Sequence, residues 1–285
     1  MPDVPQDGGK LIALAVYLGV KNRGGNFMAS DGIILVTGGS RGIGAATAEL
    51  LAQNGNRVVI CDIVPEALDN TKTTLWPQPF DVSREDNVVS GVAAIEAAHG
   101  PINGLVHAAG VYGKMHSVER IRMENWDREV NIDLRGTFLV DRAVGVRMAE
   151  RGHGSIVNIA SVAGMTSGPI HAYTAAKAGV IQLTLTLAAE WGRSGVRVNA
   201  VSPGFTRTVA LQAGIDSGAM NEERMSRNAA MGRLVDPIEV AQAIAWLLGP
   251  ASSAVTGINL PVDAGFFAGA TWDAYGGVRG PKAKS

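Results

Sequence analysis

The sequence has little of several features that mark particular protein classes. Its single cysteine, Cys61, excludes an intramolecular disulfide framework and a zinc site built from several cysteines. Aromatic residues make up only 5% of the chain, which does not favour a surface of stacked rings. Basic and acidic residues nearly balance, at 25 and 26, and the lack of a basic excess argues against a nucleic-acid partner.

The start of the chain also lacks an apolar run long enough to cross a membrane. The longest run there covers residues 11–20, whereas a spanning helix needs about 20 apolar residues. We therefore expect residues 1–30 to be an extension outside the core, with Met28 as a candidate natural start. A peripheral anchor and a secretion signal are the alternatives, although only Lys10 precedes the run as a positive charge. We expect a cytoplasmic protein with no membrane partner.

The composition is that of an ordinary globular domain that can bury a sizeable core, with 285 residues, of which 46% are hydrophobic and 18% charged. Short apolar runs alternate with segments of helical periodicity. The predicted strands cover residues 33–36, 57–62, 102–107, 155–160, 196–201 and 258–262. The predicted helices cover residues 42–54, 84–98, 124–150, 171–191 and 237–248. This alternation predicts an α/β fold of Rossmann type, a doubly wound parallel sheet of about seven strands with helices on both faces. One catalytic domain over 31–265 and a tail over 266–285 are expected.

A glycine-rich segment, TGGSRGIG at residues 37–44, separates the first predicted strand from the first helix. Glycine permits a tight turn and lets the backbone approach a pyrophosphate, which the helix N-terminus attracts. The segment lacks the Gly-Lys-Ser/Thr ending of mononucleotide ATPases, so dinucleotide binding is favoured. The residues expected to bind the cofactor here are Gly38, Ser40, Arg41, Gly42, Ile43 and Gly44.

Asp62 ends the second predicted strand, where a carboxylate can accept hydrogen bonds from the adenosine ribose. A 2′-phosphate would meet a like charge there, so NAD is favoured over NADP. Arg41 argues the other way, because a guanidinium can pair with that phosphate. Asp81 is a candidate for the adenine edge, or else an ordinary turn aspartate.

A tyrosine and a lysine one helical turn apart, Tyr173 and Lys177, are candidates for acid/base chemistry. A nearby ammonium favours the phenolate form, which can take a proton from an alcohol. Ser161 follows a predicted strand, and ligands bind at the carboxyl ends of strands in such sheets. Its hydroxyl is placed to hydrogen-bond a substrate oxygen.

These residues together resemble the short-chain dehydrogenase/reductase family, in its shorter single-domain subgroup. The resemblance runs from about residue 31 to 265 and rests on the glycine segment, Asn131, Ser161, Tyr173 and Lys177. Further matches are Asp81-Val82, Pro203-Gly204, Gly232-Arg233, Thr256-Gly257 and Val262-Asp263.

The resemblance implies a role for each matching residue. Tyr173 would be the acid/base, and Lys177 would favour its ionisation and hold the nicotinamide ribose. Ser161 would position the substrate oxygen, and Asn131 would hold a water in a proton relay. Thr206 would reach the nicotinamide carboxamide. The other implied cofactor contacts are Val82, Ala109, Gly110, Pro203 and Gly204. The family also implies a homotetramer packed through residues 124–150 and 171–191, and no metal is expected.

Two segments depart from the family pattern. His107 stands where the family usually has an asparagine that braces the sheet, which puts that brace in doubt. The tail after Asp263 holds Phe266, Phe267, Trp272 and Tyr275. It is either a loosely packed surface segment or one that closes a substrate pocket, in this chain or a neighbour.

The sequence thus predicts an NAD(H)-dependent oxidoreductase that moves hydride between nicotinamide and a secondary alcohol or ketone. The alternatives are an NADPH-dependent biosynthetic reductase, for example of 3-oxoacyl thioesters, and a non-catalytic cofactor-binding scaffold. The segments expected around the substrate, 163–171 and 205–231, are mostly apolar and favour a small apolar or cyclic substrate. Their arginines, Arg207, Arg224 and Arg227, are expected in solvent rather than on an acidic substrate.

Overall fold

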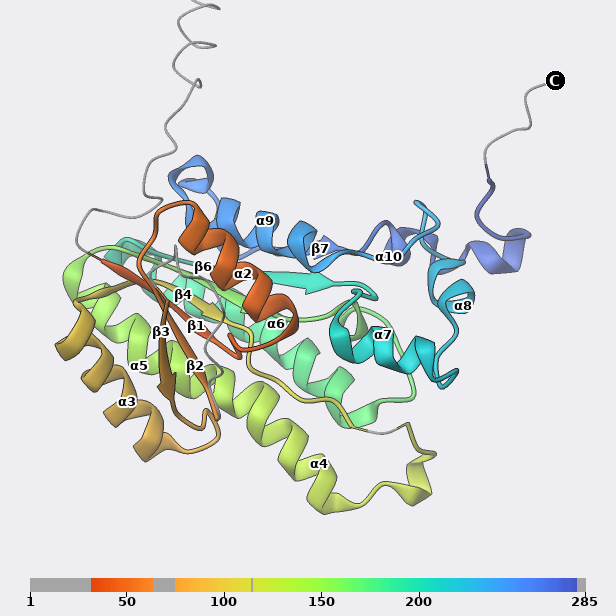
Figure 1. Cartoon of the computed structure of the whole chain (residues 1–285), viewed down its shortest axis with the longest axis horizontal. Coiled ribbons are helices and arrows are strands. Elements are labelled where there is room, and N and C mark those ends of the chain that lie inside the picture. The colour runs from red at the N-terminus through yellow and green to blue at the C-terminus, as the bar shows by residue number, and fades with distance from the viewer. Residues whose placement is uncertain (1–31, 64–74, 114, 281–285) are drawn as a thin grey trace, which may run out of the picture.

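The computed structural model describes residues 32–63, 75–113 and 115–280 (Figure 1). The expected amino-terminal extension and its candidate start, Met28, lie outside the described residues. Most of the tail over 266–285 is described, up to residue 280.

The centre of the molecule is a parallel sheet of seven strands. Its order is β3-β2-β1-β4-β5-β6-β7, and every neighbouring pair is parallel. The strands are β1 (Ile33–Thr37), β2 (Val58–Asp62), β3 (Leu75–Pro79), β4 (Ile102–His107), β5 (Gly154–Ile159), β6 (Val196–Pro203) and β7 (Asn259–Val262). All five residues of β1 are buried, as expected for a strand covered on both faces. The predicted Rossmann-type sheet is confirmed.

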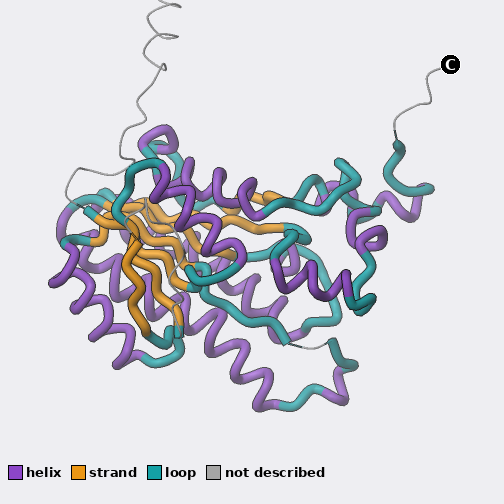
Figure 2. Tube along the Cα trace, in the orientation of Figure 1, coloured by secondary structure: helices purple, strands orange, loops and turns teal. Residues whose placement is uncertain are grey.

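Helices cover both faces of the sheet, as Figure 2 shows by the orange strands lying between purple helices. Helices α2 and α9 pack on one face, and α3, α5 and α6 pack on the other. The helices are α2 (Gly42–Gln53), α3 (Glu85–His99), α4 (Met123–Val130), α5 (Gly136–Arg151), α6 (His171–Trp191), α7 (Val209–Asp216), α8 (Glu222–Ser226), α9 (Pro237–Leu248) and α10 (Phe266–Gly269). Within the described ranges, none combines the length and apolar character that a membrane crossing requires.

The predicted helix over 124–150 is interrupted in the structure. Helices α4 and α5 run into each other through a π-helical turn, Asn131–Arg135. A π-turn adds a residue to the helical turn, so the side chains around it face different directions from those in a regular α-helix. This change matters for the site described below.

Strand β3 was not predicted, because its sequence, LWPQP, contains two prolines. Proline cannot donate a backbone hydrogen bond, so it is confined to the edge of a sheet. In the structure β3 is one of the two edge strands of the described sheet, and its neighbour there is β2, with Pro77 beside Ile60 and Pro79 beside Asp62.

The strand order reverses between β1 and β4. From β1 the chain goes to β2 and β3 on one side, and then returns to β4 on the other. Such a switch point opens a crevice at the carboxyl ends of the two strands, where doubly wound sheets bind ligands.

Candidate active site

The glycine loop lies against the backbone of the loop that follows β4. Gly38 has a positive φ of 62°, and a Cβ there would lie 2.7 Å from the Ala109 nitrogen. At the start of α2, a Cβ on Gly44 would lie 2.1 Å from the Gly38 carbonyl oxygen. Both positions therefore require glycine, one for its backbone conformation and the other for close packing of helix on loop.

The N-terminus of α2 fits the pyrophosphate of a dinucleotide. Its N-cap residue, Arg41, makes no side-chain capping bond, and no acidic residue stands in the first turn. The first helical N–H groups and the positive end of the helix dipole are thus directed toward the crevice without a side-chain acceptor at the cap. Arg41, Ile43 and Gly44 line the crevice.

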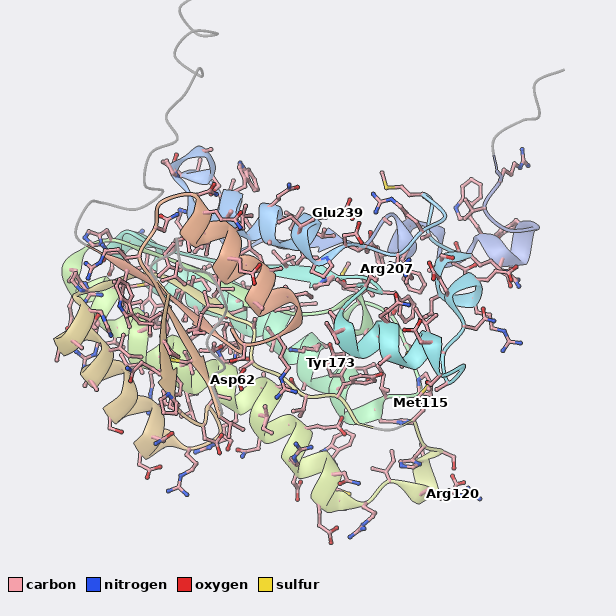
Figure 3. The ribbon with its side chains drawn as sticks, in the orientation of Figure 1. Asp62, Met115, Arg120, Tyr173, Arg207 and Glu239 are labelled. Atoms are coloured by element: carbon pink, nitrogen blue, oxygen red, sulfur yellow. The ribbon has the colours of Figure 1, made fainter. Side chains whose placement is uncertain are left out.

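The two predicted aspartates of the adenosine side are placed differently. Asp62 ends β2, next to β1, and its Oδ1 accepts a hydrogen bond from the Ile63 nitrogen at 2.8 Å (Figure 3). Asp81 closes a turn before α3, where its Oδ1 accepts from the nitrogen and the hydroxyl of Ser83. Val82, the next residue, is buried and contacts Gly136.

The histidine at the end of β4 makes a structural bond across the sheet. His107 Nδ1 lies 3.1 Å from the hydroxyl oxygen of Thr37 on β1, and that oxygen also accepts from the Ala109 nitrogen. Burial, with a smaller contribution from the Lys177 charge, lowers the pKa of His107 to about 3, so the imidazole is neutral. The link between β1 and β4 that the sequence put in doubt is therefore present.

Helix α6 brings Tyr173 and Lys177 to the crevice (Figure 3). The Lys177 ammonium is almost fully buried, donates to the Ile159 carbonyl oxygen at 2.9 Å and lies 5.5 Å from the centre of the Tyr173 ring. Tyr173 also meets Tyr112 edge to face, with ring centres 6.0 Å apart. A fixed positive charge beside a tyrosine favours the phenolate form, which suits a group that exchanges a proton.

Two further predicted residues, Ser161 and Thr206, follow the ends of strands, make local hydrogen bonds and are not among the residues that line the crevice. Ser161 follows β5, is nearly buried and accepts from the Ala163 nitrogen at 3.1 Å. Thr206 follows the Pro203-Gly204 end of β6 and donates to the Gly204 carbonyl oxygen at 3.0 Å. A hydroxyl that accepts a backbone bond still has a proton to donate, so Ser161 remains able to bond a substrate oxygen.

Asn131 is not brought to the crevice. Its Oδ1 accepts from Arg135 at 3.2 Å, within the π-turn, and it is not among the residues that line the crevice. Asp133, two residues later, lines the crevice instead. Its carboxylate is fully buried and lies 3.5 Å from the Lys177 ammonium. Asp133 was not among the predicted site residues, because the family resemblance pointed to Asn131 in this segment.

The crevice is a cleft of about 200 Å³. It joins the glycine loop, the loop after β4 and the start of α6. Its lining residues are Arg41, Ile43, Gly44, Ala108, Gly110, Val111, Tyr112, Asp133, Ile159, Tyr173, Lys177 and Thr208. Thr208 lies within the segment 205–231 that was expected around the substrate. The lining residues outside every site prediction are Ala108, Val111, Tyr112, Asp133 and Ile159. In the described part of the chain, no three His, Cys, Asp or Glu side chains gather as a metal site.

The C-terminal tail packs on the segment expected to surround the substrate. Phe266 of α10 meets Phe205 edge to face, with ring centres 5.2 Å apart. Asp273 pairs with Arg227 next to α8. Arg207 pairs with Glu222 of α8, so two of the three arginines considered for the substrate are held by carboxylates of this chain.

Comparison with known proteins agrees with this geometry. A family model described as enoyl-(acyl carrier protein) reductase matches residues 38–267. The 2,5-dichloro-2,5-cyclohexadiene-1,4-diol dehydrogenase of Sphingobium indicum is 39% identical over 241 residues, covering 82% of this chain and 96% of the relative. The cis-4-hydroxycyclohexanecarboxylate dehydrogenase of Sinomonas cyclohexanicum is 37% identical over 247 residues, covering 84% and 98%. A crystal structure described as ribose-5-phosphate isomerase from Brucella melitensis has a TM-score of 0.84 and 45% identity, covering 89% of this chain and 100% of that one.

The chain therefore belongs to the short-chain dehydrogenase/reductase family. The prediction of an NAD(P)-dependent enzyme of the alcohol dehydrogenase and ketone reductase class is confirmed at that level.

Proposed function

We propose that the protein is an NAD-dependent dehydrogenase of secondary alcohols carried on a small ring. The observation that supports this most directly is the position of Tyr173, on the cleft wall beside the buried Lys177 ammonium and next to the glycine loop. Apolar and aromatic groups of Val111, Tyr112 and Ile159 share the cleft, which suits a ring more than a charged chain. Two of the similar enzymes are named for substrates with a hydroxyl on a six-membered ring.

In this proposal each residue has a limited task. The glycine loop and the α2 N-terminus hold the pyrophosphate, and Lys177 holds the nicotinamide ribose. When bound, the nicotinamide supplies the hydride acceptor. Tyr173 takes the hydroxyl proton of the substrate, and Ser161 keeps the substrate oxygen close to the Tyr173 hydroxyl.

Replacing Tyr173 by phenylalanine tests the acid/base assignment. The variant removes one hydroxyl, so we expect kcat for oxidation of a cyclic alcohol to fall roughly 100-fold or more. Binding of NADH, measured by its fluorescence, should stay close to the wild-type value. Wild-type and variant are first screened for NAD reduction with cyclic diols, linear alcohols, sugars and hydroxysteroids.

Tyr112→Phe is the matched control, because Tyr112 lines the same cleft and packs against Tyr173. It should keep most of the activity. Equal losses in the two variants, or a Tyr173→Phe enzyme within a few-fold of wild type, would refute the mechanism.

Asp62 supports NAD as the cofactor. A carboxylate at the end of β2 accepts hydrogen bonds from ribose hydroxyls and repels a 2′-phosphate. We expect Asp62→Ala to lower the KM for NADP roughly tenfold, about 1.4 kcal/mol of relieved repulsion, and to raise the KM for NAD. Asp86→Ala, the same change on the exposed face of α3, should alter neither constant. An unchanged ratio of the two constants in Asp62→Ala contradicts the assignment.

Two other functions are distinguished by the same assays. The description of the matching family model favours reduction of an acyl thioester as the second candidate. That activity would appear as NADPH oxidation with a 3-oxoacyl or enoyl thioester and not as NAD reduction with alcohols. An isomerase, the name carried by the Brucella melitensis relative, does not oxidise its substrate, so ribose 5-phosphate would be converted without any nicotinamide.

A further inference from the structure

The inner wall of the cleft holds a second charged group that faces Lys177. Asp133 comes from the π-turn between α4 and α5, and its side chain is 0% exposed. Its Oδ1 lies 3.5 Å from the Lys177 ammonium, and the Lys177 side chain is only 6% exposed. The two opposite charges thus form an ion pair shielded from solvent, where electrostatic interactions are stronger than in water.

The same oxygen is held by the loop that follows β4. Asp133 Oδ1 accepts a hydrogen bond from the Val111 nitrogen at 3.0 Å. A Cβ on Gly110 would lie 2.5 Å from this oxygen and 3.4 Å from the Lys177 ammonium, so the backbone is packed directly on the ion pair. On this side, the loop leaves no space for either charged group to shift.

Among the described groups packed around Asp133, Lys177 supplies the positive charge of the ion pair. His107, at the end of β4, is neutral because its pKa is about 3. Glu129, one turn earlier on α4, adds a further negative charge near Asp133. Burial raises the pKa of the Asp133 carboxyl above its ordinary value, while the Lys177 charge and the Val111 amide oppose that rise. Arg41 also lines the cleft and is exposed, and Tyr173 lies beside the pair, with its ring centre 5.5 Å from the Lys177 ammonium.

We propose that Asp133 is a positioning residue that fixes the Lys177 ammonium at the inner end of the cleft and offsets its charge. Tyr173 then works at a higher pH than it would if an uncharged amide replaced the Asp133 carboxylate. This inference rests on the proposed function of Tyr173. A lone ammonium would favour the phenolate strongly, whereas an ammonium paired with a carboxylate favours it less. The enzyme would therefore be suited to alcohol oxidation in alkaline solution.

Asp133→Asn tests this, because it removes the charge and keeps the shape. We expect the pH of half-maximal kcat/KM for alcohol oxidation to fall by about one unit, since the Lys177 charge is no longer offset. The matched control is Asp127→Asn, the same change on an exposed position of α4, which should leave the pH profile in place. Asp133→Ser, also neutral, should shift the profile in the same direction and serves if Asp133→Asn fails to fold.

A second measurement needs neither substrate nor cofactor. The ultraviolet absorbance of tyrosinate is titrated in the wild type and in Asp133→Asn, and the titration of a Tyr173→Phe background is subtracted from each. The midpoint of the Tyr173 signal should fall in the neutral variant. An equal midpoint in both proteins, or an unchanged pH profile, overturns the proposal. A wild type that oxidises no alcohol refutes the proposed function instead, and the tyrosinate titration still decides the charge effect.

Discussion

At the scale of single residues, Asp141 is the clearest case of a charge that the fold does not accommodate. It lies on the face of α5 that packs on the sheet, and it is completely buried. Its Oδ2 accepts from the Asn158 amide at 2.8 Å, while Oδ1 has no donor among the described residues. Burial raises the pKa of the carboxyl to about 7, with the Asn158 bond opposing the rise. The neutral acid suits this site better than the carboxylate.

This gives a prediction about stability and pH. The pKa of Asp141 is higher in the folded than in the unfolded chain, so the folded state binds more protons between the two values. The contribution of Asp141 to the free energy of unfolding should therefore be most favourable below about pH 4 and should fall as the pH rises to about 7. Asp141→Asn should remove this loss, on the order of 4 kcal/mol at most.

Urea unfolding at about pH 5 and about pH 8 measures the effect. Relative to wild type, Asp141→Asn should be the more stable at the higher pH, with the difference shrinking at the lower one. The exposed Asp127→Asn should follow the wild-type curve at both. A constant difference between Asp141→Asn and wild type would show that Asp141 does not titrate in this range.

Cys61 is a second buried side chain whose neutral form suits its surroundings. It lies on β2 next to Asp62 and is 1% exposed. Burial, and then the Asp62 charge, raise the pKa of its thiol well above the ordinary value. The thiolate is the reactive form of cysteine, so Cys61 belongs to the core rather than to the chemistry.

At the scale of elements, we expect the contact between α2 and the glycine loop to determine how tightly the cofactor is bound. Gly44 lies on the first turn of α2, directly over the Gly38 carbonyl. We expect Gly44→Ala to push the helix away from the loop, because a Cβ 2.1 Å from that oxygen cannot be accommodated. The affinity for NADH should fall roughly tenfold or more, and the melting temperature should drop by several degrees.

Fluorescence titration with NADH and thermal unfolding measure the two effects. Gly192→Ala is the control, since Gly192 has a negative φ and no atom within 4 Å of a Cβ. Unchanged NADH affinity in Gly44→Ala would contradict the role of this contact.

The elements also show what the sequence could predict. Apolar runs and helical periodicity located most strands and helices, and helices α6 and α9 were predicted with the bounds that the structure has. The strand–loop–helix pattern predicted Gly44 as a site residue, and the i,i+4 spacing predicted Tyr173 and Lys177. All three line the cleft.

The failures have physical causes that a single sequence does not show. No pattern in the sequence marks the π-turn, from which Asp133 reaches Lys177 while Asn131 bonds Arg135. Strand β3 is held by its pairing with β2 and not by its own propensity. Helix α10 packs through Phe266 on Phe205, which lies far from it in the sequence.

At the scale of the whole molecule, five of the exposed large apolar side chains lie on two separate sets of helices. Phe138 and Val146 on α5 and Leu185 on α6 form one set. Ile238 and Trp246 on α9, which covers the opposite face of the sheet, form the other. Two distinct apolar faces on one chain are what a tetramer with two kinds of two-fold interface requires.

We therefore predict a homotetramer, with a mass of four chains of 29.6 kDa in sedimentation or light scattering. A buried glutamate in an interface leaves an unpaired charge, so Val146→Glu should separate the interface of α5 and α6 and leave dimers held by α9. Trp246→Glu should separate the interface of α9 and leave dimers held by α5 and α6. Val89→Glu, on an exposed position of α3 outside both sets, is the control and should remain a tetramer. A monomeric wild type at micromolar concentration, or a Val146→Glu protein of unchanged mass, would show that these faces do not assemble the chain.

Because both helices that carry the first set also border the cleft, through the π-turn and Tyr173, loss of this interface should lower activity as well as mass.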